Sequence, residues 1–347
     1  MTILAIDTSF DDTAVAITRK RVVLSNVLST DQSLHAQWGG VVPNLARLHH
    51  QENIDTVIAA ALKRANCTWD SIDAIAVTRG PGLAVALEVG IAKARELALS
   101  HGKKLLEVNH MEGHLLSWAA LSPKTALSTK TKELENLFPA LGILISGGHT
   151  QFVYTTGIGH YEVVGQTQDD AIGECFDKVG RMLLLGYPAG KMVEWIAKKG
   201  SPGKFVFPVP MRQVKSADTS YSGLKTAAMR MIEPLKEANL LSQQTIADIA
   251  YAFQYAAVKH LTEKLQFALT KYPVKSLLIG GGVAANLYLR EELRNVASQH
   301  KLQIKFPRSR KLCTDNAAMI GIVAYLHPCE VATAENLDRL PNWKLDQ

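Results

Sequence analysis

The chain has no long hydrophobic run. None of its apolar stretches approaches the roughly 20 consecutive residues that a membrane-spanning helix requires. Its first residues, Met1 to Asp7, have the pattern of a buried strand and lack the features of a signal or transit peptide. We therefore expect a protein without a membrane span and without a membrane partner.

Cysteine is also scarce. The four cysteines, Cys67, Cys175, Cys313 and Cys329, are far apart in the sequence, which excludes the short paired spacing of a zinc ribbon. They do not form the dense framework of a small secreted domain either. A reducing compartment is expected, the cytoplasm first and an organelle as the alternative.

What the chain does have is enough apolar sequence for two cores. Hydrophobic residues make up 47% of its 347 residues and charged residues 20%, a composition typical of folded domains. At roughly 150 residues per domain, this length favours two domains. The formal net charge of +6 suits a polyanionic partner such as a nucleic acid, although many basic proteins bind none.

One local pattern occurs twice. A buried strand, residues 3–6, leads through an acidic turn, residues 7–12, into a second strand, residues 13–18. Residues 141–145 and 151–155 repeat it around the turn Ser146-Gly147-Gly148-His149-Thr150. The repetition predicts an internal duplication. The acidic turn offers carboxylates to a metal, and the glycine turn offers amides and hydroxyls to a phosphate.

A histidine pair lies between an apolar strand, residues 105–108, and an apolar helical pattern, residues 115–121. His110 and His114 are four residues apart, so on a helix they share one face and can bind one divalent metal. Taken alone, the pair is more typical of two buried or solvated histidines. Asp315 has two interpretations as well, because it also stands where a helix over residues 317–325 needs an N-cap.

Further glycine turns precede predicted helices. Arg79-Gly80-Pro81-Gly82 precedes a helix over residues 83–100, and residues 280–286 precede a helix that ends near residue 298. Such turns are able to hold an anion or a flat ring. Ordinary strand-to-helix connections remain the alternative.

Taken together, these blocks resemble the TsaD type of tRNA N6-adenosine threonylcarbamoyltransferase, a branch of the actin–hexokinase–heat-shock ATPase superfamily. The resemblance runs from about residue 3 to about residue 325 and rests on the following blocks: DTSFDDT, GGVVP, RGPGL, NHMEGH, LISGGHTQ, DDAIGECFDKV, YSGLK, GGGVAAN and CTDNAAMIG. It implies an α/β fold of two duplicated actin/hexokinase-like (RNase H-like) mixed-sheet domains with a cleft between them. We expect an N-terminal half over residues 1–138, a C-terminal half over residues 139–327 and a tail over residues 328–347.

The resemblance also implies a reaction. The family moves the threonylcarbamoyl group of threonylcarbamoyl-AMP to N6 of the adenosine 3′ of the anticodon, in tRNAs that read codons beginning with A, and releases AMP. It uses one divalent metal ion, iron or zinc, and binds an adenine nucleotide. Expected partners are tRNA together with either a paralogous subunit and a small ATPase, as in bacteria, or a second copy of the chain.

Site residues follow by matching motifs. His110, His114 and Asp315 resemble the metal ligands. Asp11 and Asp12 match an acidic pair implicated in activity, and we take Asp11 as the general base. The remaining matches resemble positions that contact the substrate: Leu144, Ile145, Ser146, Gly147, Gly148, Asp177, Gly190 and Asn286.

This chain departs from the family pattern at a few positions. Asp7 and Phe10 stand where the family usually has glutamate and cysteine, Asn44 stands in place of another glutamate, and Ala189 replaces a glycine. The basic stretches over residues 198–204 and 308–311 are expected to bind tRNA phosphates.

Four other functions are weighed. A metalloprotease is excluded by geometry, because Glu112 is two residues from each histidine and faces away from them on a helix. A small-molecule O-carbamoyltransferase shares the fold and the metal chemistry. A sugar kinase or ATPase follows from the fold alone. A non-catalytic scaffold paralogue would have no reason to keep the ligand set.

Overall fold

The computed structural model describes residues 1–30, 40–125, 132–331 and 336–347 and divides into two compact units. Unit 1 consists of residues 1–136, 158–161 and 306–347, and unit 2 of residues 137–157 and 162–305. The chain therefore returns to unit 1 at Phe306, a return that the expected division at residue 138 did not include.

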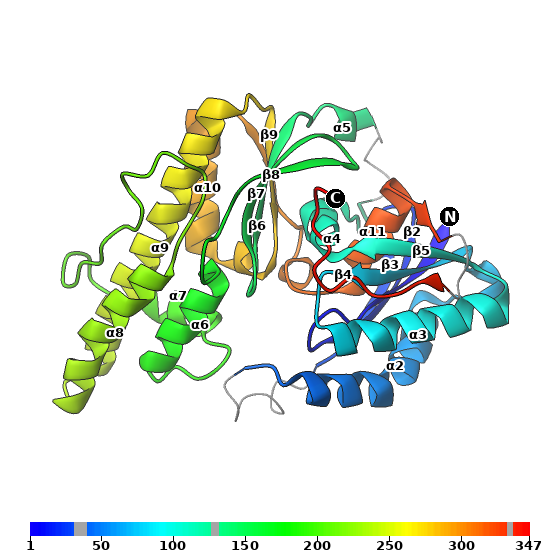
Figure 1. Ribbon diagram of the computed structural model, residues 1–347, viewed down its shortest axis with the longest axis horizontal. Helices are drawn as coiled ribbons and strands as arrows, with labels where there is room; N and C mark the ends of the chain where they lie inside the picture. The colour runs from blue at the N-terminus through cyan, green and yellow to red at the C-terminus, as the bar shows by residue number, and fades with distance from the viewer. Residues whose placement is uncertain (31–39, 126–131, 332–335) are drawn as a thin grey trace. The chain divides into compact units, whose positions relative to one another are not determined.

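Unit 1 is built on a mixed sheet whose described strands follow the order β11-β5-β4-β1-β2-β3 (Figure 1). Strand β1 pairs antiparallel with β2 and parallel with β4, and β4 pairs parallel with β5. The strand bounds are β1 (Thr2–Asp7), β2 (Thr13–Arg19), β3 (Val22–Ser29), β4 (Ala74–Gly80), β5 (Lys104–Asn109) and β11 (Cys329–Glu330).

Unit 2 repeats this topology with the strand order β10-β9-β6-β7-β8. Strand β6 pairs antiparallel with β7 and parallel with β9, and β9 pairs parallel with β10. Its strands are β6 (Ala140–Ile145), β7 (Thr150–Gly157), β8 (His160–Gln166), β9 (Ser276–Gly280) and β10 (Gln303–Lys305). Each sheet thus begins with a hairpin whose first strand pairs with a later parallel strand, and the predicted duplication is confirmed.

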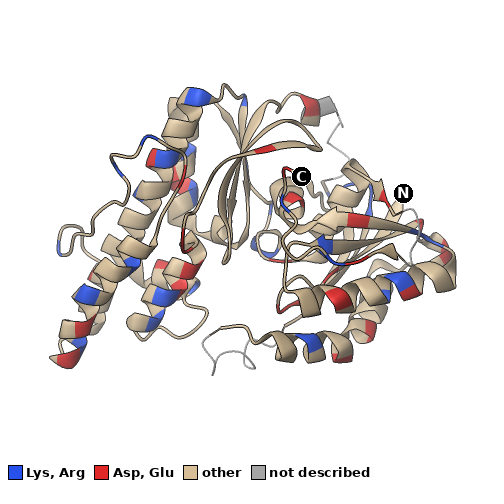
Figure 2. Cartoon of the chain, in the orientation of Figure 1, with Lys and Arg blue, Asp and Glu red and all other residues tan. Residues whose placement is uncertain are grey.

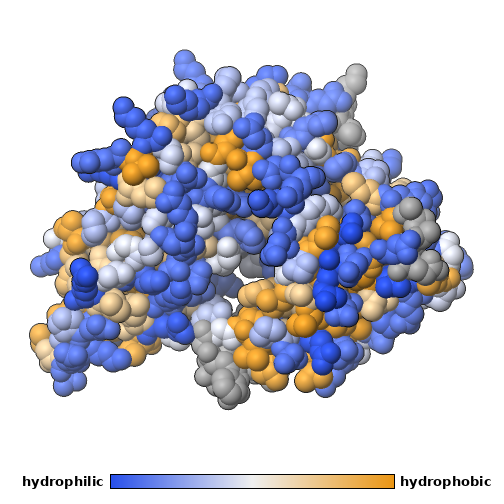
Figure 3. Space-filling view, viewed as in Figure 1, coloured by the Kyte–Doolittle hydropathy of each residue, from blue (hydrophilic) through white to orange (hydrophobic). Residues whose placement is uncertain are grey.

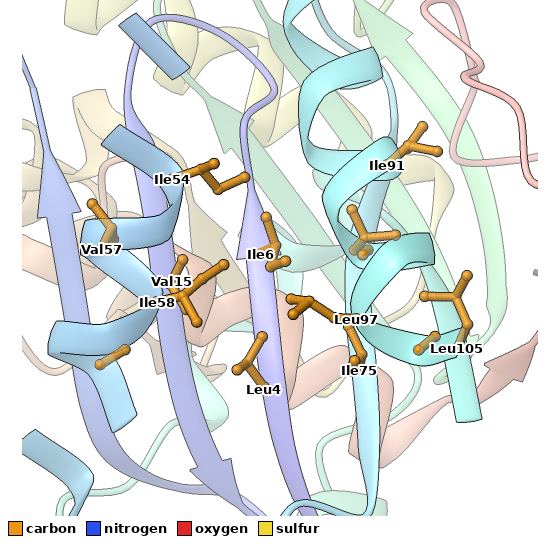
Figure 4. Packing of buried hydrophobic residues seen from close by; sticks show 14 of the residues in the cluster. Leu4, Ile6, Val15, Ile54, Val57, Ile58, Ile75, Ile91, Leu97 and Leu105 are labelled. Carbon is orange, nitrogen blue, oxygen red and sulfur yellow. The ribbon is translucent and has the colours of Figure 1, made fainter. Parts of the chain in front are cut away.

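Helices cover both faces of the unit 1 sheet. Helices α2 (Pro43–Ala65) and α3 (Ala84–His101) pack on one face and contribute Ile54, Ile58 and Leu97 to a buried cluster with Leu4, Ile6 and Ile75 (Figure 4). Ile17 belongs to that cluster. The next residue, Thr18, faces the other side, where it meets Gly321 of α11 (Ala317–Leu326). Because successive strand residues alternate between faces and both faces are covered, β2 is buried from Thr13 to Thr18.

The remaining helices differ from the sequence expectation mainly at their ends. The histidine helix α4 (His110–Leu116) is shorter than expected and continues as a 3₁₀ turn over Ser117–Ala119. In unit 2, Phe253 lies in the core. The centroid of its ring is 5.1 Å from that of Phe176 and 6.4 Å from that of Phe207. The other helix bounds are α5 (Lys132–Glu135), α6 (Ile172–Met182), α7 (Gly190–Ala197), α8 (Ser222–Glu237), α9 (Gln243–Lys271) and α10 (Leu287–Gln299).

Two expected absences can be compared with the described residues. Among them, no helix combines the length and the hydropathy that crossing a membrane would require. The four cysteines, all of them among the described residues, are free thiols.

The core of unit 1 yields a stability prediction. Ile75 is fully buried in β4, so Ile75→Ala should lower the free energy of unfolding by about 2–5 kcal/mol through lost burial and a residual cavity. Thermal and denaturant unfolding measure the effect. Leu99→Ala on the exposed side of α3 is the matched control and should change stability by less than about 0.5 kcal/mol. An equal loss in both variants would contradict the burial argument.

Candidate metal centre and substrate-binding loops

Three side chains of unit 1 converge in the manner of a metal site. The ligand atoms of His110, His114 and Asp315 lie within 4.8 Å of one another. Asp315 Oδ1 is 3.1 Å from His114 Nε2 and 3.6 Å from His110 Nε2. These two separations are close to the roughly 3.3 Å expected between two ligand atoms with bonds of about 2.0–2.1 Å to one ion, so His110, His114 and Asp315 would be able to hold a divalent metal. Three protein ligands would leave a coordination position for substrate or water.

The carboxylate of Asp315 is available because another residue caps the helix. The N-cap of α11 is Asn316, whose Oδ1 accepts the N–H of Met319 at 3.1 Å. Asp315 therefore stands one residue before the cap and points to the histidines, 201 positions away from His114 in the sequence. The alternative interpretation of Asp315 as the N-cap is wrong.

Helix α4 is held in place at its start and along its length. Asn109 caps it by accepting the N–H groups of Met111 (2.9 Å) and Glu112 (3.3 Å). A Cβ added to Gly113 would lie 3.1 Å from the side chains of Met319 and Ile320 on α11. Helix α4, which carries the histidines, and α11, which follows Asp315, are therefore in close contact where Gly113 stands.

The charges around the imidazoles favour a cation. Burial opposes the charged form of His110, but the carboxylates of Asp7 and Asp315 outweigh it and raise its pKa to about 10. Burial also opposes ionisation of Asp315, yet the two histidines hold its pKa well below the usual range. Without a metal the site would hold a proton in its place. Asp7 Oδ2 lies 3.5 Å from His110 Nδ1, the position of a carboxylate that orients a ligand histidine.

The acidic turn lies near this centre and is fixed by a residue that the sequence did not reveal. His50 of α2 is buried, with Nδ1 2.7 Å from Thr13 Oγ1 and Nε2 3.1 Å from the Phe10 carbonyl. Burial raises the pKa of Asp12 to about 7, and the nearby carboxylates of Asp11 and Asp315 add to the shift. The carboxylate of Asp12 is therefore suited to accept a proton near neutral pH.

Glu112 has a positioning role that only the structure shows. Its buried carboxylate accepts hydrogen bonds from Tyr161 Oη at 2.7 Å and from His327 Nδ1 at 3.0 Å. Tyr161 lies in the segment over residues 158–161, and His327 follows α11. The glutamate between the two histidines thus ties α4 to two other segments of unit 1.

In unit 2, the glycine turn after β6 is fixed by its neighbours and open at its tip. The Ser146 N–H donates to the His149 carbonyl, and Ser146 Oγ accepts the His149 N–H. A Cβ on Gly173 would lie 2.5 Å from the Ser146 carbonyl. By contrast, nothing lies within 4 Å of a Cβ added to Gly147 or Gly148. Leu144 and Ile145 are fully buried in β6, so neither has exposed surface, and they support the turn that follows.

The other predicted contact residues also lie in unit 2. Asp177 Oδ1 on α6 accepts the N–H groups of Ala189 (2.8 Å) and Gly190 (2.9 Å), which fixes the start of α7. Asn286 accepts the Leu289 N–H as the N-cap of α10 and donates to Gln254 Oε1. Its amide group is therefore held in one orientation.

Two motifs have structural roles. Gly82 packs so closely that an added Cβ would lie 2.4 Å from the Ser9 carbonyl, so the turn after β4 supports the acidic turn.

Asp169 accepts hydrogen bonds from Ser220 and Ser222, and Asp170 pairs with Lys178 and Lys225. These contacts fasten the segment before α6 to the start of α8.

Comparison with known proteins gives the family. A model of the TsaD family, tRNA N6-adenosine threonylcarbamoyltransferase, matches residues 22–322. The chain is 43% identical over 335 residues to the protein of that name from Nostoc punctiforme, covering 94% of this chain and 91% of that one. It is 44% identical over 330 residues to the corresponding protein of Thermosynechococcus vestitus, covering 94% and 90%.

Solved structures agree on the fold. The chain resembles component A of the (R)-2-hydroxyglutaryl-CoA dehydratase of Acidaminococcus fermentans, with 13% identity and a TM-score of 0.52 over 94% of this chain and 98% of that chain. It also resembles full-length HypF, with 12% identity and a TM-score of 0.58 over 93% of this chain and 46% of that chain. At such identities the likeness shows the fold alone, and it confirms the predicted actin/hexokinase-like class.

The ligand geometry predicts the effect of substitutions on metal binding. His114→Ala and Asp315→Ala should each abolish stoichiometric binding of iron or zinc, because either change leaves two ligands. Asp7→Asn should weaken metal affinity by about 10- to 100-fold, as expected for a residue that orients a ligand. Metal content after dialysis and titration with Zn²⁺ measure both effects. His160→Ala, an exposed histidine of unit 1, is the control. Full metal content in His114→Ala would refute the site.

Burial of Asp12 predicts a pH-dependent gain in stability. A carboxyl group with pKa about 7 in the folded protein and 3.8 as its ordinary value makes the folded state less stable as pH rises from about 4 to 7. Asp12→Asn should therefore raise the melting temperature of the metal-free protein by a few degrees at pH 8, with a gain that disappears towards pH 4.

Thermal unfolding in the presence of a chelator measures this gain. The exposed Asp70→Asn serves as control and should show little change. A lower melting temperature of Asp12→Asn at pH 8 would mean that the carboxylate stabilises the fold.

Proposed function

The chain belongs to the tRNA N6-adenosine threonylcarbamoyltransferase family, and we propose that it transfers the threonylcarbamoyl group of threonylcarbamoyl-AMP to N6 of the adenosine 3′ of the anticodon. The observation that carries this proposal is the convergence of His110, His114 and Asp315. A catalytic member of the family needs that set, and a scaffold would not.

The chemistry of the substrates defines what the protein must supply. Threonylcarbamoyl-AMP is a mixed carbamic–phosphoric anhydride and is already activated, so no covalent nucleophile is required. The adenine amine is a weak nucleophile. The protein must therefore orient the two reactants, accept the proton of N6 and stabilise charge on the carbonyl oxygen and the departing phosphate.

Unit 1 would hold the metal and accept the proton. When bound by the two imidazoles and Asp315, a divalent ion supplies Lewis acidity. As the N6–C bond forms and the C–O bond to AMP breaks, AMP leaves with the electron pair, and the N6 proton needs an acceptor. Asp12 suits this role because its pKa of about 7 lies at the working pH, which favours it over Asp11 as the general base.

Unit 2 would bind the adenylate. Gly147 and Gly148 have open space around them, and their N–H groups are the donors that we assign to the oxygen atoms of a phosphate or an oxyanion. Asp177 holds the start of α7, and the fixed amide of Asn286 adds a polar contact. The roles of these residues as substrate contacts rest on motif matches and on this geometry.

Further parts of the proposal concern partners and RNA contacts. The exposed loop with Arg308, Arg310 and Lys311 is proposed to contact tRNA phosphates. Iron and zinc both suit two imidazoles and a carboxylate. The protein partners are either a paralogous subunit with a small ATPase or a second copy of the chain, acting in the cytoplasm.

A reconstituted reaction tests the proposal. The protein, threonylcarbamoyl-AMP and unmodified tRNA should give N6-threonylcarbamoyladenosine and AMP, and a chelator should suppress both products. Mass spectrometry of digested tRNA measures the nucleoside. Transfer to a small alcohol with no modified tRNA would favour the O-carbamoyltransferase alternative.

Gly148→Ala is the most informative variant in that assay. Because its Cβ would meet no protein atom within 4 Å, the substitution should leave the melting temperature unchanged. It should nevertheless raise KM for threonylcarbamoyl-AMP by about tenfold or more, since a methyl group would separate the turn from a ligand. Gly223→Ala, another position with open space, is the control. Unchanged kinetics in Gly148→Ala would remove the turn from the site.

A further inference from the structure

One segment of unit 2 carries a concentration of positive charge. Residues 181–217, here the basic segment, contain seven lysines and arginines and one acidic residue, a net charge of +6 that equals the net charge of the whole chain. The acidic residue, Glu194, is buried and accepts the N–H of Leu287 at 3.0 Å. The surface of this segment therefore presents no acidic side chain, and Lys and Arg mark the loop that joins α7 to α8 (Figure 2).

An exposed tryptophan lies within this segment. Trp195 on α7 is 50% exposed, and Lys199 Nζ lies 4.0 Å from the centroid of its ring. The opposite side of the helix carries Val193 and Ala197, which are buried. The packing of α7 is thus complete without Trp195. In the space-filling view, hydrophobic residues lie among hydrophilic ones on the visible face of the protein (Figure 3).

The ring of Trp195 lies a short distance along α7 from Gly190, one of the predicted substrate contacts. Helix α7 begins at Gly190, whose N–H is bound by Asp177. Five residues at 1.5 Å each place Trp195 about 7.5 Å farther along the helix axis. At about 3.4 Å per step of a stacked strand, this is the length of about two nucleotides.

We propose that Trp195 stacks on an unpaired base of the tRNA loop, close to the adenosine that is modified, while lysines of the basic segment bind the flanking phosphates. The inference rests on the proposed function and adds a recognition element to it. A flat aromatic ring among cations matches single-stranded RNA, because every base has a face to stack and every nucleotide has a phosphate to neutralise. Lys191 on α7 and Lys198 and Lys199 directly after it are exposed and are close to the ring in the sequence.

Binding of a tRNA anticodon stem-loop to the full chain tests the inference. Trp195→Ala should weaken binding about 5- to 150-fold, the range expected for loss of one stacked base. Trp195→Phe should retain most of the affinity, and Trp195→Leu should behave like the alanine variant because leucine has no ring. A blunt RNA duplex of the same length, which has no unpaired base, should bind all four proteins equally.

A second set of variants distinguishes the contribution of the lysine charges to RNA binding from that of the Trp195 ring. Lys198→Gln combined with Lys199→Gln should weaken loop and duplex binding together and reduce the salt dependence of both. Lys236→Gln and Leu240→Ala, exposed positions of unit 2 outside the basic segment, should bind as the wild type does.

Several results would overturn the inference. The first is that Trp195→Ala binds the loop as tightly as the wild type does. The second is that Trp195→Ala loses as much affinity for the duplex as for the loop. The third is that Trp195→Leu keeps its affinity for the loop. A changed oligomeric state of Trp195→Ala with unchanged RNA binding would assign the ring to a protein partner. The proposed function fails separately: a wild type that forms no modified nucleoside, while Trp195→Ala still loses loop affinity, refutes the reaction and keeps the stacking contact.

Discussion

The close contact between α4 and α11 at Gly113 is the constraint on which the candidate centre depends. A Cβ at this position would lie 3.1 Å from the side chains of Met319 and Ile320, so those side chains would have to shift to make room for it. The carboxylate of Asp315 stands one residue before the cap of α11, so its distance from the histidines is set by how closely the helices pack. Burial then adds the chemistry, because two imidazoles and several carboxylates held away from water favour a cation between them.

Close backbone approach explains most of the glycine-rich motifs. Gly82 supports the acidic turn in unit 1, and Gly173 and Gly281 pack on the turn after β6 in unit 2, with added Cβ atoms only 2.4 to 2.5 Å from backbone oxygens. Gly281 also has φ of +93°, which favours glycine. Gly147 and Gly148 are different, since they face open space. The same residue type thus assembles the loops in one place and leaves room for a ligand in another.

The residues that position the centre were harder to predict than those that compose it. His50, Tyr161 and His327 belong to no short motif, and each acts through a contact with a residue far away in the sequence. Glu112 was predicted to face away from the two histidines, and its carboxylate binds Tyr161 and His327. Its partners could not be named, because hydrogen bonds between distant segments leave no spacing in the sequence. The same holds for α7, whose exposed tryptophan has significance only beside the lysines around it.

The sequence by itself determined the duplicated hairpins, most helices and the family, because these rest on local hydrophobic periodicity and on motifs a few residues long. It also identified His110 and His114 as a pair, since helical spacing alone puts them on one face. Only the tertiary structure decided that residues 306–347 return to unit 1, that Asn316 and not Asp315 caps α11, and that Asp12 is buried enough to hold a proton near neutral pH. The first and the last of these follow from packing between segments far apart in the sequence. The cap is a local hydrogen bond, and it leaves Asp315 to histidines 201 positions away, a contact that only the folded chain makes.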